Sequence, residues 1–79
     1  MNLAIIGCGV IGQRHFESIL NLDYKMKIFL VDKSAICLNK CKKISLKKKK
    51  FKTFHFVNNI NKIKENIDFV IIATNSKNR

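Results

Sequence analysis

The sequence has no long apolar run, no proline and few acidic residues, and these absences limit what the chain can be. A membrane-spanning helix needs about 20 consecutive apolar residues, and no run in the chain approaches that length. Residues 3–6 are too short for the apolar core of a signal peptide, and glycine follows them at once. The three cysteines are an odd number and form no recognisable disulfide framework. We therefore expect a cytoplasmic protein with reduced thiols and no membrane partner.

The scarcity of acidic residues leaves a strongly basic chain, because 16 lysines and arginines stand against five acids and give a net charge of +11. Such a charge by itself suggests nucleic acid or another anionic surface. However, 14 of the 16 are lysine, and Lys, Asn and Ile together make up 35 residues, a composition typical of an AT-rich genome. No pattern of arginine and aromatic residues accompanies the charge. Nucleic-acid binding is therefore the weaker alternative, based on the eight lysines among residues 40–52.

With 79 residues, 47% of them apolar, the chain is expected to form one small globular domain. Apolar runs predict strands at residues 3–6, 25–32, 51–57 and 68–74, the first and last of them buried on both faces. Helical spacing predicts a helix at residues 10–22 and a second one that carries Cys37, Leu38, Cys41 and Ile44. It also predicts a short helix with Ile60, Ile63 and Ile67 on one side, for which Asn58 or Asn59 is the cap. The order β-α-β-α-β-α-β predicts an α/β class, a partial Rossmann fold with a parallel sheet of about four strands.

Local signals also predict where individual side chains lie. Phe54 and Phe56 should share one face of the third strand and His55 the other, because side chains alternate along a strand. Either Asp32 or Ser34 is positioned to cap the second helix.

Three glycines separate the first strand from the first helix, in the spacing Gly7-x-Gly9-x-x-Gly12. This is the fingerprint of a dinucleotide-binding βαβ unit. Gly7 would permit the sharp turn, Gly9 would let a diphosphate approach the backbone, and Gly12 would let the helix pack closely. The backbone N–H groups of Val10 and Ile11 at the helix N-terminus would then bind the diphosphate.

Asp32 lies 20 residues beyond the last of these glycines, at the end of the second predicted strand. A carboxylate there accepts hydrogen bonds from the adenosine ribose in dinucleotide-binding folds. Because Asp32 would repel a 2′-phosphate, the sequence favours NAD as the cofactor. Lys33 follows immediately and would attract that phosphate, so NADP stays an alternative.

Four further residues are weaker candidates. Thr74 lies at the carboxyl end of the last strand, where open α/β sheets bind ligands, so it is a candidate cofactor contact. His15 lies in the first helix, where a helix-surface role is favoured over acid–base catalysis. We also expect Arg14 to be a solvated helix residue and His55 to face solvent.

Cys37 and Cys41 share a helix face at a spacing that two metal ligands can use. No second pair and no nearby histidine supports a metal site. We therefore expect these to be core-packing thiols and assign no metal ligand.

The segment "AIIGCGVIGQRH", residues 4–15, resembles the N-terminal signature of the Gfo/Idh/MocA oxidoreductases, in which a histidine matches His15. Their second strand commonly ends in an aspartate that matches Asp32. Their fourth strand is similar to "DFVIIAT", residues 68–74. The resemblance spans essentially the whole chain.

This resemblance implies a nicotinamide-dependent oxidoreductase that transfers hydride to or from a sugar, polyol or related small hydroxy compound. In that family a second, α+β domain helps to form the substrate site, and a Glu-Lys-Pro motif supplies a catalytic lysine. Here Asn75 stands where the family usually has proline, and the sequence ends at Arg79, before that motif. We therefore expect residues 1–79 to be the N-terminal part of a dinucleotide-binding domain, inactive alone, with no catalytic residue and no substrate-binding domain.

Two further expectations stand beside this one. The glycines and Asp32 fit a non-enzymatic nucleotide-sensing module equally well, although His15 and residues 68–74 favour the oxidoreductase. The strand that ends at Ala73 would also leave an exposed apolar sheet edge, which favours self-association.

Overall fold

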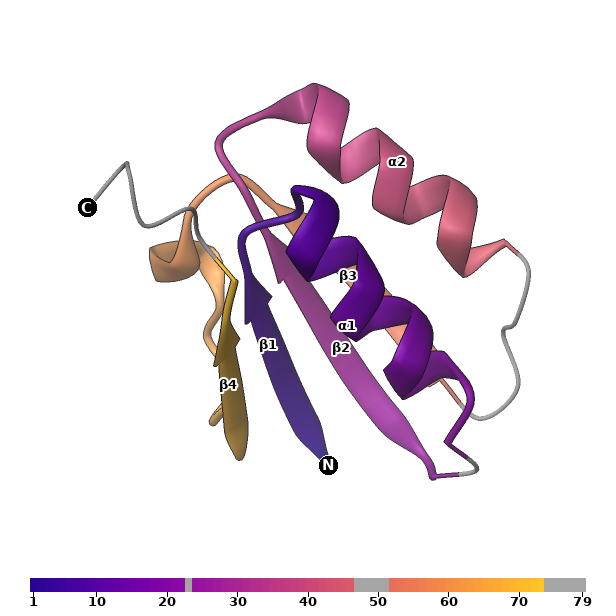
Figure 1. Cartoon of the computed structure of the whole chain (residues 1–79). Coiled ribbons are helices and arrows are strands. Elements are labelled where there is room, and N and C mark those ends of the chain that lie inside the picture. Colours follow the sequence, from indigo (N-terminus) through magenta and orange to yellow (C-terminus); the bar gives the residue numbers. More distant parts are fainter. Residues whose placement is uncertain (23, 47–51, 74–79) are drawn as a thin grey trace.

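The computed structural model describes residues 1–22, 24–46 and 52–73. In these residues four parallel strands form one sheet in the order β3-β2-β1-β4 (Figure 1). The elements are β1 (Asn2–Ile6), α1 (Val10–Leu20), β2 (Met26–Val31), α2 (Ala35–Ser45), β3 (Lys52–Val57), the 3-10 turn η1 (Ile60–Lys62) and β4 (Phe69–Ile72). The predicted α/β class and partial Rossmann fold are therefore confirmed.

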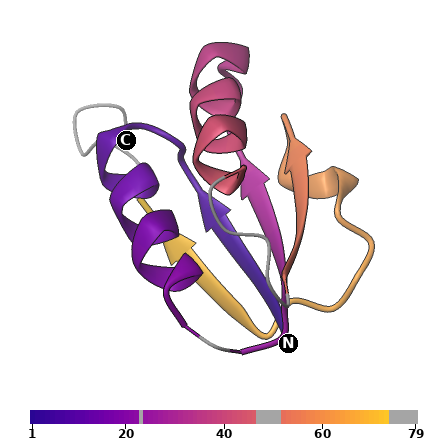
Figure 2. The same cartoon turned by 90° about the vertical axis from the view of Figure 1, so that its right-hand side faces the viewer.

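Both α-helices pack on one face of the sheet, and the segment that contains η1 lies on the opposite side (Figure 2). The core fills the space between the helices and the sheet. From α1 it receives Phe16, Ile19 and Leu20, and from the central strands β1 and β2 it receives fully buried side chains such as Ile5 and Ile28. This burial explains the continuous apolar runs of β1 and β2, which have neighbours on both sides in the sheet.

The third strand is an edge strand whose two faces differ as predicted. Phe54 and Phe56 pack against the core, and the Phe54 ring meets Phe16 edge to face at a centroid distance of 5.5 Å. His55 is exposed on the other face and stacks on Phe29, with ring centroids 5.1 Å apart. Core-facing and exposed side chains therefore alternate along β3, as expected for a half-buried strand.

The second helix begins at the predicted cap. The Ser34 hydroxyl accepts a hydrogen bond from the Cys37 backbone N–H at 3.3 Å, and Ser34 is the N-cap residue. Lys42 and Lys43 lie in the last turn, where positive charge interacts favourably with the helix dipole.

Two predictions about the C-terminal third of the chain are wrong. The predicted buried strand forms as β4, but its side chains are largely exposed: Phe69 by 58%, Val70 by 49% and Ile72 by 65%. The reason is its position at the edge of the sheet, where only β1 pairs with it among the described residues. The predicted third helix is only the single turn η1, which Asn59 caps by accepting from the Asn61 N–H; Ile67 lies outside it.

The prediction for Thr74 falls outside the described residues, and so do the four consecutive lysines at residues 47–50. Within the described ranges, neither 11-residue helix has the length and apolarity to cross a bilayer.

Candidate functional site

A hollow of about 1050 Å³ lies at the carboxyl ends of the strands, beside the N-terminus of α1. We call it the carboxyl-end hollow. Six of the eight residues predicted to bind a cofactor line it: Gly7, Gly9, Val10, Ile11, Asp32 and Lys33. Gly12 is buried and does not line the hollow, and Thr74 is outside the described residues. A smaller hollow of about 530 Å³ at the opposite ends of the strands includes none of these residues.

The turn out of β1 depends on Gly7. Its φ of 102° lies in the left-handed region, which is strongly disfavoured for every residue except glycine. Its N–H donates to the Val31 carbonyl at 2.8 Å, which extends the contact between β1 and β2 to the start of the turn.

Gly12 is required by the packing of α1 on this turn. A Cβ atom at Gly12 would lie 1.8 Å from the Gly7 carbonyl oxygen and 2.8 Å from the Gly7 carbonyl carbon. Because both atoms belong to the backbone, no side-chain movement could make room. Glycine is therefore required at position 12 because α1 lies directly against the Gly7 carbonyl of the turn.

The N-terminus of α1 has no side-chain cap. Gly9 is its N-cap residue and offers no side-chain oxygen, and the first turn contains no acidic residue. Apart from Gly9 and its chain neighbours, no atom of the described residues lies within 4 Å of the place that a Cβ of Gly9 would take. Val10 and Ile11 are 68% and 57% exposed. The first N–H groups of a helix have no partner within the helix, so these groups are left to solvent or to an anion.

The Asp32 carboxylate connects the end of β2 to the glycine turn. One oxygen, Oδ2, accepts from the Cys8 backbone N–H at 2.7 Å, and Oδ1 accepts from the Ser34 N–H at 2.8 Å. Of the two residues proposed as the cap of α2, Ser34 is the cap, and Asp32 forms a turn before it. A carboxylate has about four acceptor positions, so further hydrogen bonds to a ligand remain available at Asp32.

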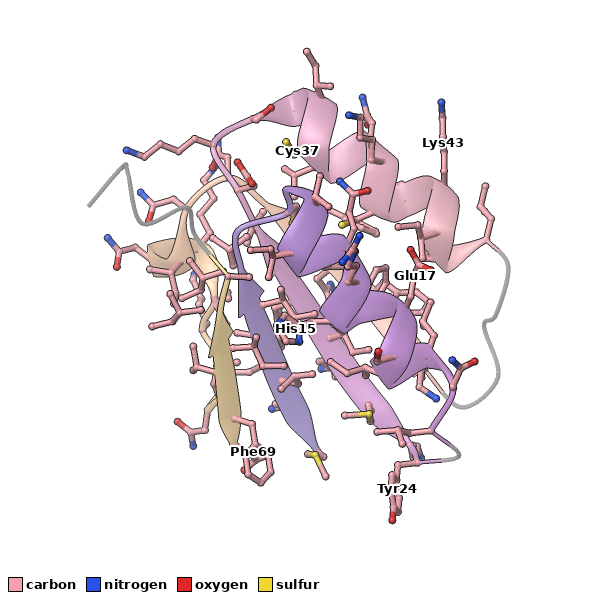
Figure 3. The ribbon with its side chains drawn as sticks, viewed as in Figure 1. His15, Glu17, Tyr24, Cys37, Lys43 and Phe69 are labelled. Atoms are coloured by element: carbon pink, nitrogen blue, oxygen red, sulfur yellow. The ribbon has the colours of Figure 1, made fainter. Side chains whose placement is uncertain are left out.

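The far side of the hollow comes from residues that the sequence analysis did not propose as cofactor contacts. Asn58, Asn59 and Ile60 follow the carboxyl end of β3, and Cys37 lies in the first turn of α2. Figure 3 shows Cys37 at the same end of the molecule as the N-terminus of α1. A search of the segment after each strand for lining residues would have found the asparagines, because ligands bind at the carboxyl ends of parallel strands.

The remaining cysteines are buried. Cys8 and Cys41 are both fully inaccessible and belong to the hydrophobic core, as expected for Cys41. Hydrogen bonding to the Cys41 thiol and burial raise the pKa of the Cys8 thiol well above its ordinary value. No group of three potential metal ligands occurs in the described ranges.

The other candidate residues lie away from the hollow. His15 and Arg14 are exposed on α1, and neither lines the hollow. Two of the eight lysines among residues 40–52 contact other side chains or the backbone of the chain. The Lys42 Nζ lies 5.5 Å from the centre of the Phe56 ring, and the buried Lys52 Nζ donates to the Leu22 carbonyl.

Comparison with known proteins gives no family assignment, because no family model matches the chain and no curated protein is significantly similar to it. The fold and the hollow define the class, an α/β protein with a partial Rossmann-like sheet. The resemblance to the Gfo/Idh/MocA oxidoreductases stays a prediction.

Proposed function

We propose that this chain binds a nicotinamide dinucleotide, NAD in preference to NADP. We further propose that it serves an oxidoreductase acting on a sugar, polyol or related small hydroxy compound. One observation carries the binding proposal: the uncapped N-terminus of α1 and the Asp32 carboxylate line the same hollow.

The glycine turn and the start of α1 fit a diphosphate. The N–H groups at the helix N-terminus and the positive end of the helix dipole favour an anion. The space beside Gly9 is open, and no acidic residue in the first turn repels a phosphate. Gly9, Val10 and Ile11 would therefore hold the diphosphate through their backbone.

Asp32 fits the ribose of the adenosine half. Its two oxygens are already oriented by the Cys8 and Ser34 N–H groups, so little reorganisation is needed when ribose hydroxyls donate to it. Its charge disfavours the 2′-phosphate of NADP, whereas the exposed Lys33 beside it would attract that phosphate.

The reaction is supported by the family resemblance rather than by the hollow. A bound nicotinamide would supply the hydride acceptor or donor. The described chain contributes binding groups to the hollow, and none of its residues is assigned a catalytic role. The substrate class follows from the matches at His15, Asp32 and residues 68–74.

The test is an NMR titration of the ¹⁵N-labelled chain with NADH. We expect the amide signals of Gly9, Val10 and Ile11 to move, and Asp32→Ala to weaken binding by about tenfold or more, because hydrogen bonds to a charged group are lost. Asp68→Ala is the matched control: Asp68 also accepts a backbone N–H, from Asn2 at 2.8 Å, but lies at the opposite end of the sheet.

Equal NADH affinities for the native chain and Asp32→Ala would contradict the role of Asp32. Failure of the native chain to bind NADH at all would contradict the proposed function. Tighter binding of NADPH than of NADH would reverse the proposed cofactor preference.

A nucleotide-sensing module is the second candidate function. One observation favours it: among the described residues, Asp32, Lys33 and Cys37 are the only ionisable side chains that line the carboxyl-end hollow. NADH binding without hydride transfer to any carbonyl compound, by the full-length protein in its native context, would favour this alternative.

A further inference from the structure

Gln13 makes a contact that the sequence motif does not account for. It is half-buried in the first turn of α1, and its side-chain Nε2 donates to the Cys8 carbonyl at 2.9 Å. Its backbone N–H makes the first hydrogen bond of the helix, to the Gly9 carbonyl at 2.9 Å. Gln13 does not line the carboxyl-end hollow, so any effect on a ligand must act through the turn.

The Cys8 carbonyl belongs to the same planar peptide group as the Gly9 N–H. No cis peptide bond occurs in the described residues, and in a trans peptide the C=O and N–H point in opposite directions. When Gln13 holds the carbonyl on its own side, the Gly9 N–H must point away from Gln13. Gly9 itself lines the hollow, whereas Gln13 does not.

Without such a contact this peptide group would have more rotational freedom. Glycine has broad backbone freedom, and glycines lie on both sides of Cys8. The preceding peptide group, Gly7–Cys8, is held by Asp32, which accepts from the Cys8 N–H at 2.7 Å. Asp32, directly after β2, and Gln13, in α1, thus fix two consecutive peptide groups.

We infer that Gln13 is a positioning residue that holds the Cys8–Gly9 peptide with the Gly9 N–H toward the hollow, ready for the diphosphate of a dinucleotide. This inference rests on the proposed function. It assigns different tasks to the two side chains. Gln13 affects only ligands that contain a diphosphate, whereas Asp32 affects every ligand that contains adenosine.

The test compares two ligands and two variants. Gln13→Met keeps the length and neutrality of the side chain but cannot donate a hydrogen bond. Ser18→Met is the control, an exposed neutral position on the same helix. Each ¹⁵N-labelled protein is titrated with NADH and, at millimolar concentration, with adenosine, and the spectrum shows at the same time whether the chain is folded.

We expect Gln13→Met to weaken NADH binding by about fivefold, the effect of one hydrogen bond, and to leave adenosine binding unchanged. The Gly9 amide signal of the ligand-free variant should also shift. Ser18→Met should match the native chain for both ligands. If Gln13→Met does not fold, Gln13→Asn replaces it, since that amide is one methylene too short to reach the Cys8 carbonyl.

Unchanged NADH affinity in Gln13→Met would overturn the inference and leave the proposed function intact. Equal losses for NADH and adenosine would also overturn it, because they would indicate a general structural role. If the native chain bound neither ligand, the proposed function would fail and this inference with it.

Discussion

At the scale of single residues, the site depends on backbone groups that a few side chains orient. Gly12 is required because the Gly7 carbonyl occupies the space of its Cβ. Asp32 and Gln13 both hold the Cys8 backbone: Asp32 accepts from its N–H, and Gln13 donates to its carbonyl. Polar side chains around the turn therefore hydrogen-bond its backbone, and in the proposed function this backbone binds the diphosphate.

Thiol labelling tests the difference in accessibility between the three cysteines. Cys37 is half-buried and lines the hollow, whereas Cys8 and Cys41 are fully buried, and the raised pKa of Cys8 disfavours its reactive thiolate. We expect iodoacetamide to modify Cys37 first in the folded chain and saturating NADH to slow this modification. Peptide mass spectrometry measures both.

Cys37→Ser is the control for this experiment and should leave the folded chain unlabelled over the same time. Faster labelling of Cys8 or Cys41 than of Cys37 would contradict the burial of the thiol pair. A labelling rate at Cys37 that NADH does not change would argue against a ligand in this hollow.

At the scale of elements, the two helices differ at their N-termini. The first N–H groups of α2 are partly satisfied by Ser34, and its last turn carries Lys42 and Lys43. In contrast, α1 has neither a side-chain cap nor a basic residue in its last turn. Its stability must come from packing, through Phe16, Ile19 and Leu20. The helix whose N-terminus lines the carboxyl-end hollow is thus the one that lacks a side-chain cap.

The cap of α2 gives a prediction about stability. Ser34→Ala removes the oxygen that accepts from the Cys37 N–H, so we expect the free energy of unfolding to fall by about 1 kcal/mol. Urea denaturation followed by circular dichroism measures this change. Ser18→Ala, at an exposed position within α1, should change the free energy by less than about 0.5 kcal/mol. Similar losses in the two variants would show that the cap has no special role.

At the scale of the whole molecule, the two edges of the sheet differ. The β3 edge carries polar residues such as Thr53 and His55 on its exposed positions. The β4 edge exposes Phe69, Val70 and Ile72 instead, and Figure 3 shows Phe69 projecting at the start of this strand. An exposed apolar edge strand can pair with another chain, although the net charge of +11 opposes association.

Self-association of the 79-residue chain should therefore depend on β4. We expect sedimentation velocity to detect concentration-dependent association of the native chain, and Val70→Lys to reduce it, since a charge then lies on the apolar edge. Thr53→Lys adds the same charge to the β3 edge and should have a smaller effect. A native chain that stays monomeric at all concentrations would contradict this prediction.

The sequence by itself determined the parts of the fold that depend on local pattern. Continuous apolar runs specified β1 and β2, and the serine before a helical spacing specified the start of α2. The glycine spacing and the position of Asp32 predicted most of the residues that line the carboxyl-end hollow at the N-terminus of α1 and the end of β2. These features could be predicted because each depends on residues close together in the chain.

Tertiary structure alone decided the rest, because it depends on contacts between distant segments. An apolar run cannot reveal whether a strand lies at the centre or the edge of a sheet, so the exposure of β4 followed only from the strand order. The pairing of Asp32 with the Cys8 N–H joins residues 24 positions apart. The lining by Asn58 and Asn59 likewise needed the end of β3 to lie beside the end of β2.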